Sequence, residues 1–351
     1  MKVLLIMTRA TDYREAFLSE LANQVELTVV AQPCELEGLF PPENRSGYKY
    51  IEIIPRRRFG FFWQPGLRKV IHHNSWDIVC VTLNLRQLSS LFLFFTSPSF
   101  WSKWVWWGHI LGKSESKIIK FIKKYMINKA SACLTYGKWS LKRLKEELDI
   151  EAISFNNTEI KENEFRIGHF TEHQEVRLLF VGRYQSRKKL DRLIELAKSR
   201  KDVYIRLVGP GMENLQIPSE LIKNGRTATY GRTIGQELNR HFDWADLVVS
   251  PGHVGLLVMN AARHGKGIVI DSGSDHAPEF YVAKEAGQPF ISFCSQDNIN
   301  QFIDQVKNNP SLVKKWAKDL QGLAKQCYTV EKMVNTHINL FNEIAKRYKK
   351  V

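Results

Sequence analysis

The stretch Leu178-Leu-Phe-Val-Gly-Arg-Tyr-Gln-Ser-Arg-Lys-Lys-Leu-Asp-Arg-Leu-Ile194 decides the fold, because it joins a buried-strand pattern to a glycine turn and then to an amphipathic helix. The apolar run 176–181 predicts the strand, and Gly182 permits the turn that follows it. Apolar residues then recur at helical spacing, at Leu190, Leu193 and Ile194. A strand, a tight turn and a helix in this order are typical of an α/β protein.

Two cations follow the expected strand. Arg183 and Lys188 come between its carboxyl end and the start of the helix. Open α/β sheets bind nucleotides at this end of their strands, and helix starts favour anions. The stretch therefore predicts a site for a diphosphate. The alternative interpretation is a solvated helix start, in which both side chains only face water.

Length and composition indicate a large protein with about two domains. The chain has 351 residues, of which 44% are hydrophobic. Its five cysteines are odd in number and dispersed, so they predict neither a disulfide framework nor a zinc site, and a reducing cytosol fits them best. The apolar run 1–7 is too short for a signal peptide or a membrane span, and we interpret it as the first strand.

The positive charge is concentrated in the N-terminal half. The net charge is +15, and residues 51–145 contain 17 Lys and Arg against three acidic residues. Aromatic residues are mixed with this charge in 56–63 and 100–107, although 104–107 has the pattern of a buried strand. Cations beside aromatic side chains suit an anionic membrane surface, so we expect a peripheral membrane contact. Nucleic acid is the alternative partner, but no nucleic-acid-binding motif accompanies the charge, and we expect none to bind.

The chain alternates between strand-like and helix-like segments, which predicts two doubly wound α/β domains. We expect domains at 1–160 and 161–330, joined through the polar stretch 157–175, with a final helix at 331–351. Expected strands of the first domain are 3–7, 25–31, 48–53, 78–83, 104–107 and 132–136. Its expected helices are 14–22, 88–95, 115–127 and 140–148. Strands of the second domain are expected near 176, 203, 227, 247, 267 and 289.

Six further segments follow expected strands and carry polar or glycine-rich ends. They are 11–14, 106–109, 207–213, 229–232, 246–265 and 271–280. Four of them have an ordinary structural explanation as well: a Gly-Pro-Gly turn around Gly209, a surface ion pair at Arg232, a helix cap at Glu279, and an isolated histidine at His109.

Taken together and in this order, these segments resemble the signatures of retaining GT-B glycosyltransferases of the GT4 family, also called glycosyltransferase group 1. The resemblance is closest to a subgroup that assembles polysaccharides, through "SPG-x-VGL" and "H-x-PE". One departure is clear, because the family has two glutamates eight positions apart where this chain has Gly252 and Asn260. The resemblance implies nucleotide-sugar contacts at Arg183, Lys188, Gly209, Arg232, Gly255, Leu256, Asn260 and Glu279. It implies catalytic roles for His109, His253 and His276, and acceptor contacts at Tyr13 and Arg14.

The resemblance also implies the fold and the reaction. The fold would be GT-B, with two Rossmann-like domains facing a cleft and a C-terminal helix crossing back. The enzyme would move a hexosyl unit, with retention, from a nucleotide diphosphate sugar to a lipid-linked or other saccharide acceptor in bacterial surface polysaccharide biosynthesis. No Asp-x-Asp motif follows an apolar strand, so we expect neither a metal nor another cofactor. We expect a cytoplasmic protein, peripheral at the inner face of the plasma membrane.

Two alternative functions stay open at this point. A sugar-nucleotide epimerase shares the GT-B fold and the diphosphate site. A catalytically degenerate subunit that only binds a nucleotide sugar would explain Gly252 and Asn260. The sequence leaves the sugar, the base, the acceptor and the oligomeric state open, because a fold does not transfer specificity.

Overall fold

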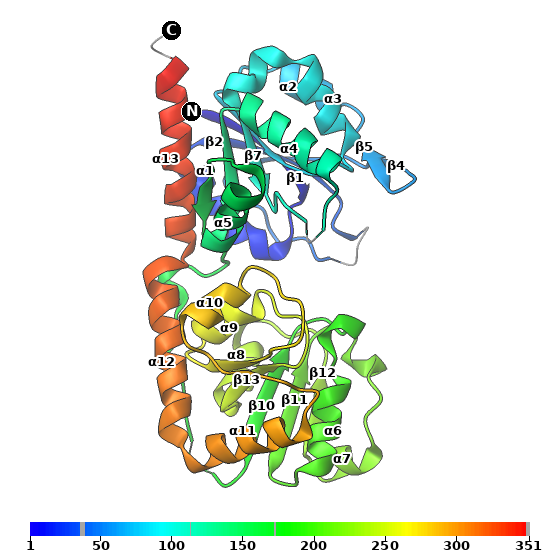
Figure 1. Cartoon of the computed structure of the whole chain (residues 1–351), viewed down its shortest axis with the longest axis vertical. Helices are drawn as coiled ribbons and strands as arrows, with labels where there is room; N and C mark the ends of the chain where they lie inside the picture. The colour runs from blue at the N-terminus through cyan, green and yellow to red at the C-terminus, as the bar shows by residue number, and fades with distance from the viewer. Residues whose placement is uncertain (36–38, 113, 172, 349–351) are drawn as a thin grey trace. The chain divides into compact units, whose positions relative to one another are not determined.

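The computed structural model describes residues 1–35, 39–112, 114–171 and 173–348, which form two compact α/β units (Figure 1). The N-terminal unit contains Met1–Glu159 together with Thr329–Val351, and the C-terminal unit contains Ile160–Tyr328. Each unit is built on a parallel sheet of the doubly wound kind. The predicted fold class, two Rossmann-like domains with a long C-terminal helix, is confirmed.

The sheet of the N-terminal unit has seven strands in the order β3-β2-β1-β6-β7-β8-β9, all paired in parallel. Its strands are β1 Lys2–Arg9, β2 Glu26–Gln32, β3 Lys49–Glu52, β6 Ile78–Thr82, β7 Trp104–Gly108, β8 Ala132–Tyr136 and β9 Ile153–Phe155. Its helices are α1 Glu15–Ala22, α2 Leu67–His72, α3 Leu88–Thr96, α4 Lys117–Lys129, α5 Gly137–Leu148 and α13 Val330–Tyr348.

Strand β1 shows how this sheet is covered on both faces. Val3 and Leu5 belong to a core cluster with residues of α1 and α13, whereas Leu4 and Ile6 belong to a second cluster with residues of α2, α3 and α4. Successive side chains of a strand point to opposite faces, so a continuous apolar run requires apolar neighbours on each side. This explains why all five residues of β7, including three tryptophans, are buried.

The C-terminal helix α13 belongs to the N-terminal unit and packs against α1 (Figure 1). Its buried residues follow helical spacing, so one face of the helix is apolar. They are Val330, Met333, Val334, His337, Leu340, Phe341 and Ile344. The chain therefore returns to its first domain, as the fold prediction required.

A two-stranded antiparallel hairpin was not anticipated. Strand β4, Arg56–Arg58, pairs with β5, Phe61–Trp63, and Phe59 and Gly60 at its tip both have positive φ angles. A 3-10 turn at Asp12–Arg14 precedes α1, so α1 begins one residue later than expected. Another 3-10 turn spans Pro98–Lys103.

The C-terminal unit has a six-stranded parallel sheet in the order β12-β11-β10-β13-β14-β15. Its strands are β10 Val176–Val181, β11 Val203–Val208, β12 Thr227–Tyr230, β13 Leu247–Ser250, β14 Gly267–Asp271 and β15 Phe290–Ile291. Its helices are α6 Asp191–Ser199, α7 Ser219–Lys223, α8 Gly235–Trp244, α9 Leu257–Arg263, α10 Phe280–Glu285, α11 Gln296–Asn308 and α12 Pro310–Cys327.

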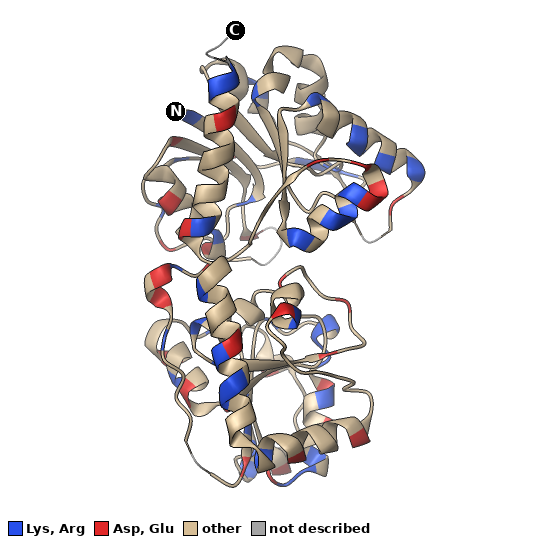
Figure 2. Ribbon diagram, turned by 60° about the vertical axis from the view of Figure 1, so that its left-hand side comes forward, with Lys and Arg blue, Asp and Glu red and all other residues tan. Residues whose placement is uncertain are grey.

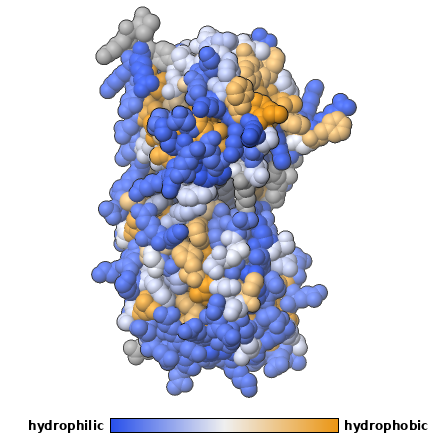
Figure 3. Space-filling view, in the orientation of Figure 1, coloured by the Kyte–Doolittle hydropathy of each residue, from blue (hydrophilic) through white to orange (hydrophobic). Residues whose placement is uncertain are grey.

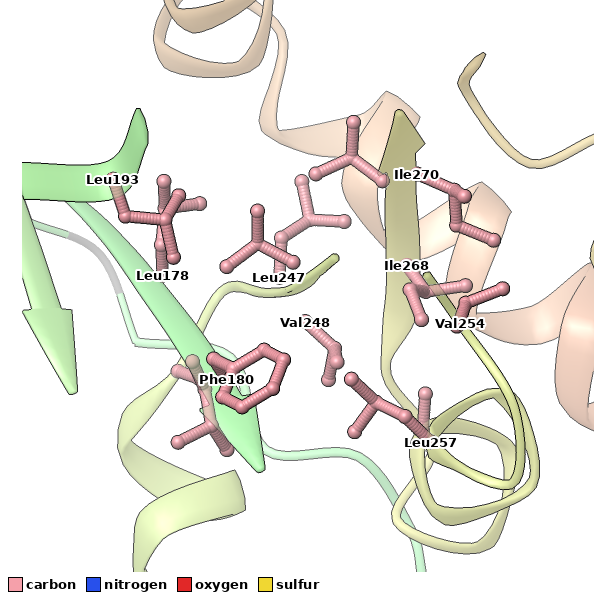
Figure 4. Packing of buried hydrophobic residues seen from close by; sticks show 14 of the residues in the cluster. Leu178, Phe180, Leu193, Leu247, Val248, Val254, Leu257, Ile268 and Ile270 are labelled. Carbon is pink, nitrogen blue, oxygen red and sulfur yellow. The ribbon is translucent and has the colours of Figure 1, made fainter. Parts of the chain in front are cut away.

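The core of this unit lies between the central strands and their helices. Figure 4 shows Leu178 and Phe180 of β10 among side chains of β13, β14 and α9. This packing holds the carboxyl ends of the strands at one edge, where the connecting loops emerge. Across the described residues, no helix combines the length and the apolar composition needed to cross a bilayer.

Candidate active site

The loops after β10 and β11 touch each other through their backbones. Gly209 has φ +141°, and a β-carbon there would overlap the Gly182 carbonyl group, whose carbon would lie only 2.7 Å away. The Gly182 amide donates to the Val208 carbonyl at 2.9 Å, and the Tyr184 amide donates to the Pro210 carbonyl at 2.9 Å. Glycine is therefore required at 209, because any side chain would push the two loops apart. The structure assigns this predicted site residue a steric role.

The loop after β13 lies equally close to the backbone of the turn that contains Arg187 and Lys188. A β-carbon at Gly252 would lie 2.7 Å from the Lys188 carbonyl group and would overlap the Arg187 carbonyl oxygen. The His253 amide donates to that oxygen at 2.9 Å, and Lys188 Nζ donates to the His253 carbonyl at 2.8 Å. A glutamate side chain, which the GT4 signature has at this position, therefore has no room at position 252.

Lys188 is a partly buried cation in a positive environment. Burial, followed by the charges of Arg187 and Arg183, lowers the pKa of Lys188 to about 8. Both effects disfavour the ammonium form. The negative charge of an anion beside this turn would stabilise the ammonium form and so offset both effects. The electrostatics of the loop therefore favour a negatively charged ligand. Arg183 is itself half-buried, one residue after Gly182.

A buried ion pair braces the same edge of the sheet. Arg192 of α6 lies 2.9 Å from Asp271 at the end of β14, and Asp271 is only 1% exposed. Arg192 also donates to the Pro251 carbonyl at 2.7 Å, and the Phe293 amide donates to Asp271 Oδ1 at 3.1 Å. Because Arg192 contacts both Pro251, which follows β13, and Asp271, which ends β14, the pair connects the carboxyl ends of these two strands.

The two predicted catalytic histidines of this unit differ in their hydrogen bonds. Both ring nitrogens of His276 are engaged: Nε2 donates to the Asp271 carbonyl at 2.8 Å, and Nδ1 accepts from the Val254 amide at 3.2 Å. His253 donates from Nδ1 to the Asp275 carbonyl at 2.7 Å, which makes Nε2 its acceptor nitrogen. Burial and three nearby basic groups lower the pKa of His253 to about 4, so the ring is neutral near pH 7.

The remaining predicted donor residues follow β12, β13 and β14. Helix α9 begins at Leu257, after Gly255 and Leu256. A β-carbon at Gly255 would lie 3.6 Å from that of Ala277, an ordinary contact, so glycine is not sterically required there. Asn260 lies in α9, where its amide reaches the Leu256 carbonyl at 3.5 Å. Glu279 is buried and occupies the N-cap position of α10. Arg232 is exposed, two residues after β12.

The N-terminal unit has a separate polar and aromatic cluster at the carboxyl ends of its own strands. Arg14, 7% exposed, donates from Nη1 to Asn157 Oδ1 at 2.6 Å and from Nη2 to the Tyr136 hydroxyl at 2.8 Å. Its guanidinium lies 5.1 Å from the Trp107 ring centroid. The cluster therefore joins the segments that follow β1, β8 and β9 around one fixed cation.

His109 and Tyr13 complete this cluster. The His109 ring lies 4.2 Å from that of Tyr136, and the Arg14 guanidinium lies 5.3 Å from the Tyr13 ring. The side chain of His109 is exposed at its surface, but the protein atoms around the ring remove part of its hydration, and this desolvation, followed by the Arg14 charge, lowers the pKa of His109 to about 4. The neutral ring can accept a hydrogen bond from a hydroxyl group.

Sequence reasoning singled out His109, Tyr13 and Arg14 but missed the side chains that connect them. Tyr136 ends β8 and Asn157 follows β9, so both lie at the strand ends where a site was expected. Arg192 and Asp271 were missed in the other unit because they are far apart in the sequence. Among the described residues, no three His, Cys, Asp or Glu side chains are grouped so as to hold a metal ion.

Comparison with known proteins matches part of the chain to a family. Residues 161–321 match the family described as "Glycosyl transferases group 1". No curated protein sequence matches the chain. Several solved structures have a similar fold, at sequence identities so low that they show the fold alone.

A sucrose-phosphate synthase from Thermosynechococcus elongatus has a TM-score of 0.74 and 14% identity over 99% of this chain and 100% of its own. A glycosyltransferase from Rickettsia africae ESF-5 has a TM-score of 0.73 and 13% identity over 98% of both chains. WaaG, a glycosyltransferase involved in lipopolysaccharide biosynthesis, has a TM-score of 0.61 and 10% identity over 97% of this chain and 99% of its own.

Proposed function

We propose that this chain, whose residues 161–321 match the family described as "Glycosyl transferases group 1", is a glycosyltransferase that moves a sugar from a nucleotide diphosphate sugar to a saccharide acceptor with retention at the anomeric carbon. The observation that carries the proposal is the close backbone contact between the loops at the carboxyl ends of β10, β11 and β13 in the C-terminal unit. There Gly209 meets Gly182 through the backbone, and Gly252 meets the turn that presents Lys188. A diphosphate can approach backbone closely only where side chains are absent.

We assign the diphosphate to Arg183, Lys188 and the Gly182–Gly209 contact. The depressed pKa of Lys188 means that an anion recovers part of the free energy lost by burying the ammonium group. During transfer the leaving diphosphate gains negative charge, and preorganised cations stabilise that charge. We therefore expect transfer to proceed in the presence of a chelator, with positive side chains doing what a metal ion does elsewhere.

The histidines take different parts in this proposal. We assign His253 to the transferred sugar, because its Nε2 can accept a hydrogen bond from a sugar hydroxyl. We assign His276 to positioning, because both of its ring nitrogens hold backbone groups of the loops after β13 and β14. Asn260 and Glu279 would bind ribose hydroxyls, Gly255 and Leu256 would contribute backbone amides, and Arg232 would contact the base.

We assign the acceptor to the cluster of the N-terminal unit. Aromatic rings pack against the apolar faces of sugars, and Arg14 offers a fixed cation to an oxygen-rich acceptor. His109 would accept a hydrogen bond from the attacking hydroxyl. The basic N-terminal half favours an acceptor that is linked to a lipid, at the inner face of the plasma membrane. Bacterial surface polysaccharide biosynthesis fits this combination, and one similar structure is a glycosyltransferase involved in lipopolysaccharide biosynthesis.

Position 252 bears on the alternative of a degenerate subunit. In a site that had merely lost its glutamate, the loop would be expected to leave the space of that side chain open. Here the backbone of Arg187 and Lys188 occupies it, and hydrogen bonds fasten the two loops. This favours a donor site built around glycine over a decayed one.

The test is nucleotide release by the purified full chain, with UDP-, GDP- and dTDP-sugars, with and without a bacterial extract of lipid-linked oligosaccharides. We expect release that requires the extract, survives EDTA, and falls about 10²–10³-fold in Lys188→Gln. Lys198→Gln on α6, an exposed lysine, is the control and should behave like the parent. Nucleotide binding without release from any donor would contradict the proposal, and analysis of the sugar would then distinguish an epimerase from a binding subunit.

A further inference from the structure

One surface of the N-terminal unit exposes large apolar side chains that its own core does not need. Ile118 and Phe121 on α4 are each 72% exposed, and Phe59 at the tip of the β4–β5 hairpin is 84% exposed. Soluble proteins expose single apolar residues often but seldom gather them on one face. Other members of this set are Phe61, Trp63, Leu88, Phe92, Phe95, Ile119, Ile122 and Tyr125.

Two ring contacts connect the elements that carry these residues. Trp63 of the hairpin lies 5.5 Å from Phe92 of α3, measured between ring centroids. Phe95, one turn further along α3, stacks on Tyr125 of α4 at 6.3 Å. The hairpin, α3 and α4 are thus neighbours, and we call their outer side chains the apolar face. Figure 3 shows orange apolar residues over α3 and the hairpin, with blue hydrophilic residues beside them.

The rotation of α4 about its axis is set by contacts on its opposite side. Lys123 is buried and donates to the Ile110 carbonyl at 2.6 Å, and the Trp106 indole donates to the Met126 carbonyl at 3.1 Å. Because these inward groups are fixed, Ile118 and Phe121 cannot turn into the core. Their exposure is a property of the fold.

Basic side chains border the apolar face. Arg56, Arg57 and Arg58 form an exposed strand of the hairpin, and Arg58 lies 5.1 Å from the Phe59 ring. Lys117 and Lys124 belong to α4. In Figure 2 the helices of this unit carry more blue basic residues than red acidic ones. Glu147, an acid beside α4, is already paired with Lys120 and Arg143.

We propose that the apolar face and its basic border dock on an anionic lipid bilayer, with Phe59, Ile118 and Phe121 entering the headgroup region. The occupant is a bilayer because protruding apolar tips need a soft apolar medium, and basic residues around them need negative charge nearby. This inference rests on the membrane location in the proposed function, but its test does not require sugar transfer.

The experiment is flotation of the full chain with vesicles of phosphatidylcholine, with or without phosphatidylglycerol, at low and high salt. We expect binding to the anionic vesicles that weakens with salt. The double variant Ile118→Ser/Phe121→Ser should reduce the partition coefficient about tenfold or more, as should Lys117→Gln/Lys124→Gln. Ile167→Ser, 84% exposed in the C-terminal unit, and Lys201→Gln/Lys223→Gln are the matched controls and should bind like the parent.

Several results would overturn the inference. These are equal binding to neutral and anionic vesicles, equal binding by parent and α4 variants, or a surface that instead binds a single-stranded oligonucleotide or a second copy of the chain. Nucleotide binding by each variant confirms that it is folded. Vesicle binding without any turnover would contradict only the proposed function, whereas turnover on a water-soluble acceptor without vesicle binding would contradict only this inference.

Discussion

The two units share a sheet topology but build the carboxyl edges of their sheets in opposite ways. Both sheets run outward from a first strand, β1 or β10, with the second and third strands on one side and later strands on the other. In the C-terminal unit, glycines at 209 and 252 let loops touch through backbone atoms. In the N-terminal unit, the same edge is filled by Arg14 and the rings around it.

The difference shows how one topology can serve two kinds of ligand. An edge without side chains offers amides and a few cations, which suit a diphosphate. An edge lined by rings and one guanidinium offers flat apolar surfaces and directed hydrogen bonds, which suit a sugar. Four predictions test this comparison of the two units.

The largest effect is expected from the brace of the C-terminal unit. Arg192→Leu leaves the Asp271 carboxylate, 1% exposed, without its ion-pair partner. Removing one member of a buried pair destabilises a protein by about 3–5 kcal/mol, which denaturant unfolding would measure. Lys198→Gln breaks the exposed pair with Glu195 on the same helix and should cost under about 0.5 kcal/mol. Similar losses in both variants would show that the brace has no special role.

Replacing Gly252 by the family's glutamate should damage the donor site. Gly252→Glu forces a side chain against the Arg187 and Lys188 carbonyls, which displaces the turn that carries the cations. We expect kcat/KM to fall about 10²–10³-fold, the range for losing a key electrostatic donor. Gly255→Ala is the matched control, since its new methyl group would meet only Ala277 at 3.6 Å. A gain of activity in Gly252→Glu would mean that the site had decayed.

Acid should destabilise the two units through different histidines. Burial lowers the pKa of His337 in the N-terminal unit and of His264 in the C-terminal unit to about 4, from the ordinary 6.5. Between about pH 6.5 and 4, each of these histidines is protonated in the unfolded chain but neutral in the folded one. The free energy of unfolding therefore falls as the pH drops through this range, by up to about 3 kcal/mol per histidine. His337→Leu should reduce this pH dependence in the N-terminal unit and leave that of the C-terminal unit unchanged, as followed by hydrogen exchange. An unchanged profile would disprove the assignment.

The smallest effect is expected at the acceptor cluster. Arg14→Lys keeps the charge but loses the paired hydrogen bonds to Asn157 and Tyr136 and the stacking on Trp107. We expect KM for the acceptor to rise about tenfold, with nucleotide affinity unchanged. Arg68→Lys, on the exposed side of α2, should alter neither. A weaker affinity for the nucleotide would show that the two edges are not independent.

The sequence predicted the long elements well and the short ones poorly. Apolar runs such as those of β1 and β10 are continuous because both sheet faces are covered, and helix spacing follows them. Strand β9 and the β4–β5 hairpin have only three residues each per strand, too few to show a period. The hairpin also consists of arginines and aromatics, which indicated a surface rather than a strand.

The place of a candidate residue in the fold was predictable where the residue follows a strand closely, as for Arg183 after β10 and His109 after β7. It was not predictable where the partner comes from another element, as for Arg192 with Asp271. Gly252 illustrates the limit best, since a sequence comparison presents it as a missing glutamate. Only the fold shows that the backbone of the 186–188 turn already occupies that place.

The most direct test of the donor site is the reactivity of Lys188 toward acetylation, followed by mass spectrometry of the full chain with and without UDP, GDP or dTDP. Because the pKa of Lys188 is lowered to about 8, part of its amine is uncharged and reactive near neutral pH. We expect one of these nucleotides to protect Lys188 while the exposed Lys198 reacts at an unchanged rate. Acetylation of Lys188 that none of the three nucleotides slows would contradict a diphosphate site at this turn.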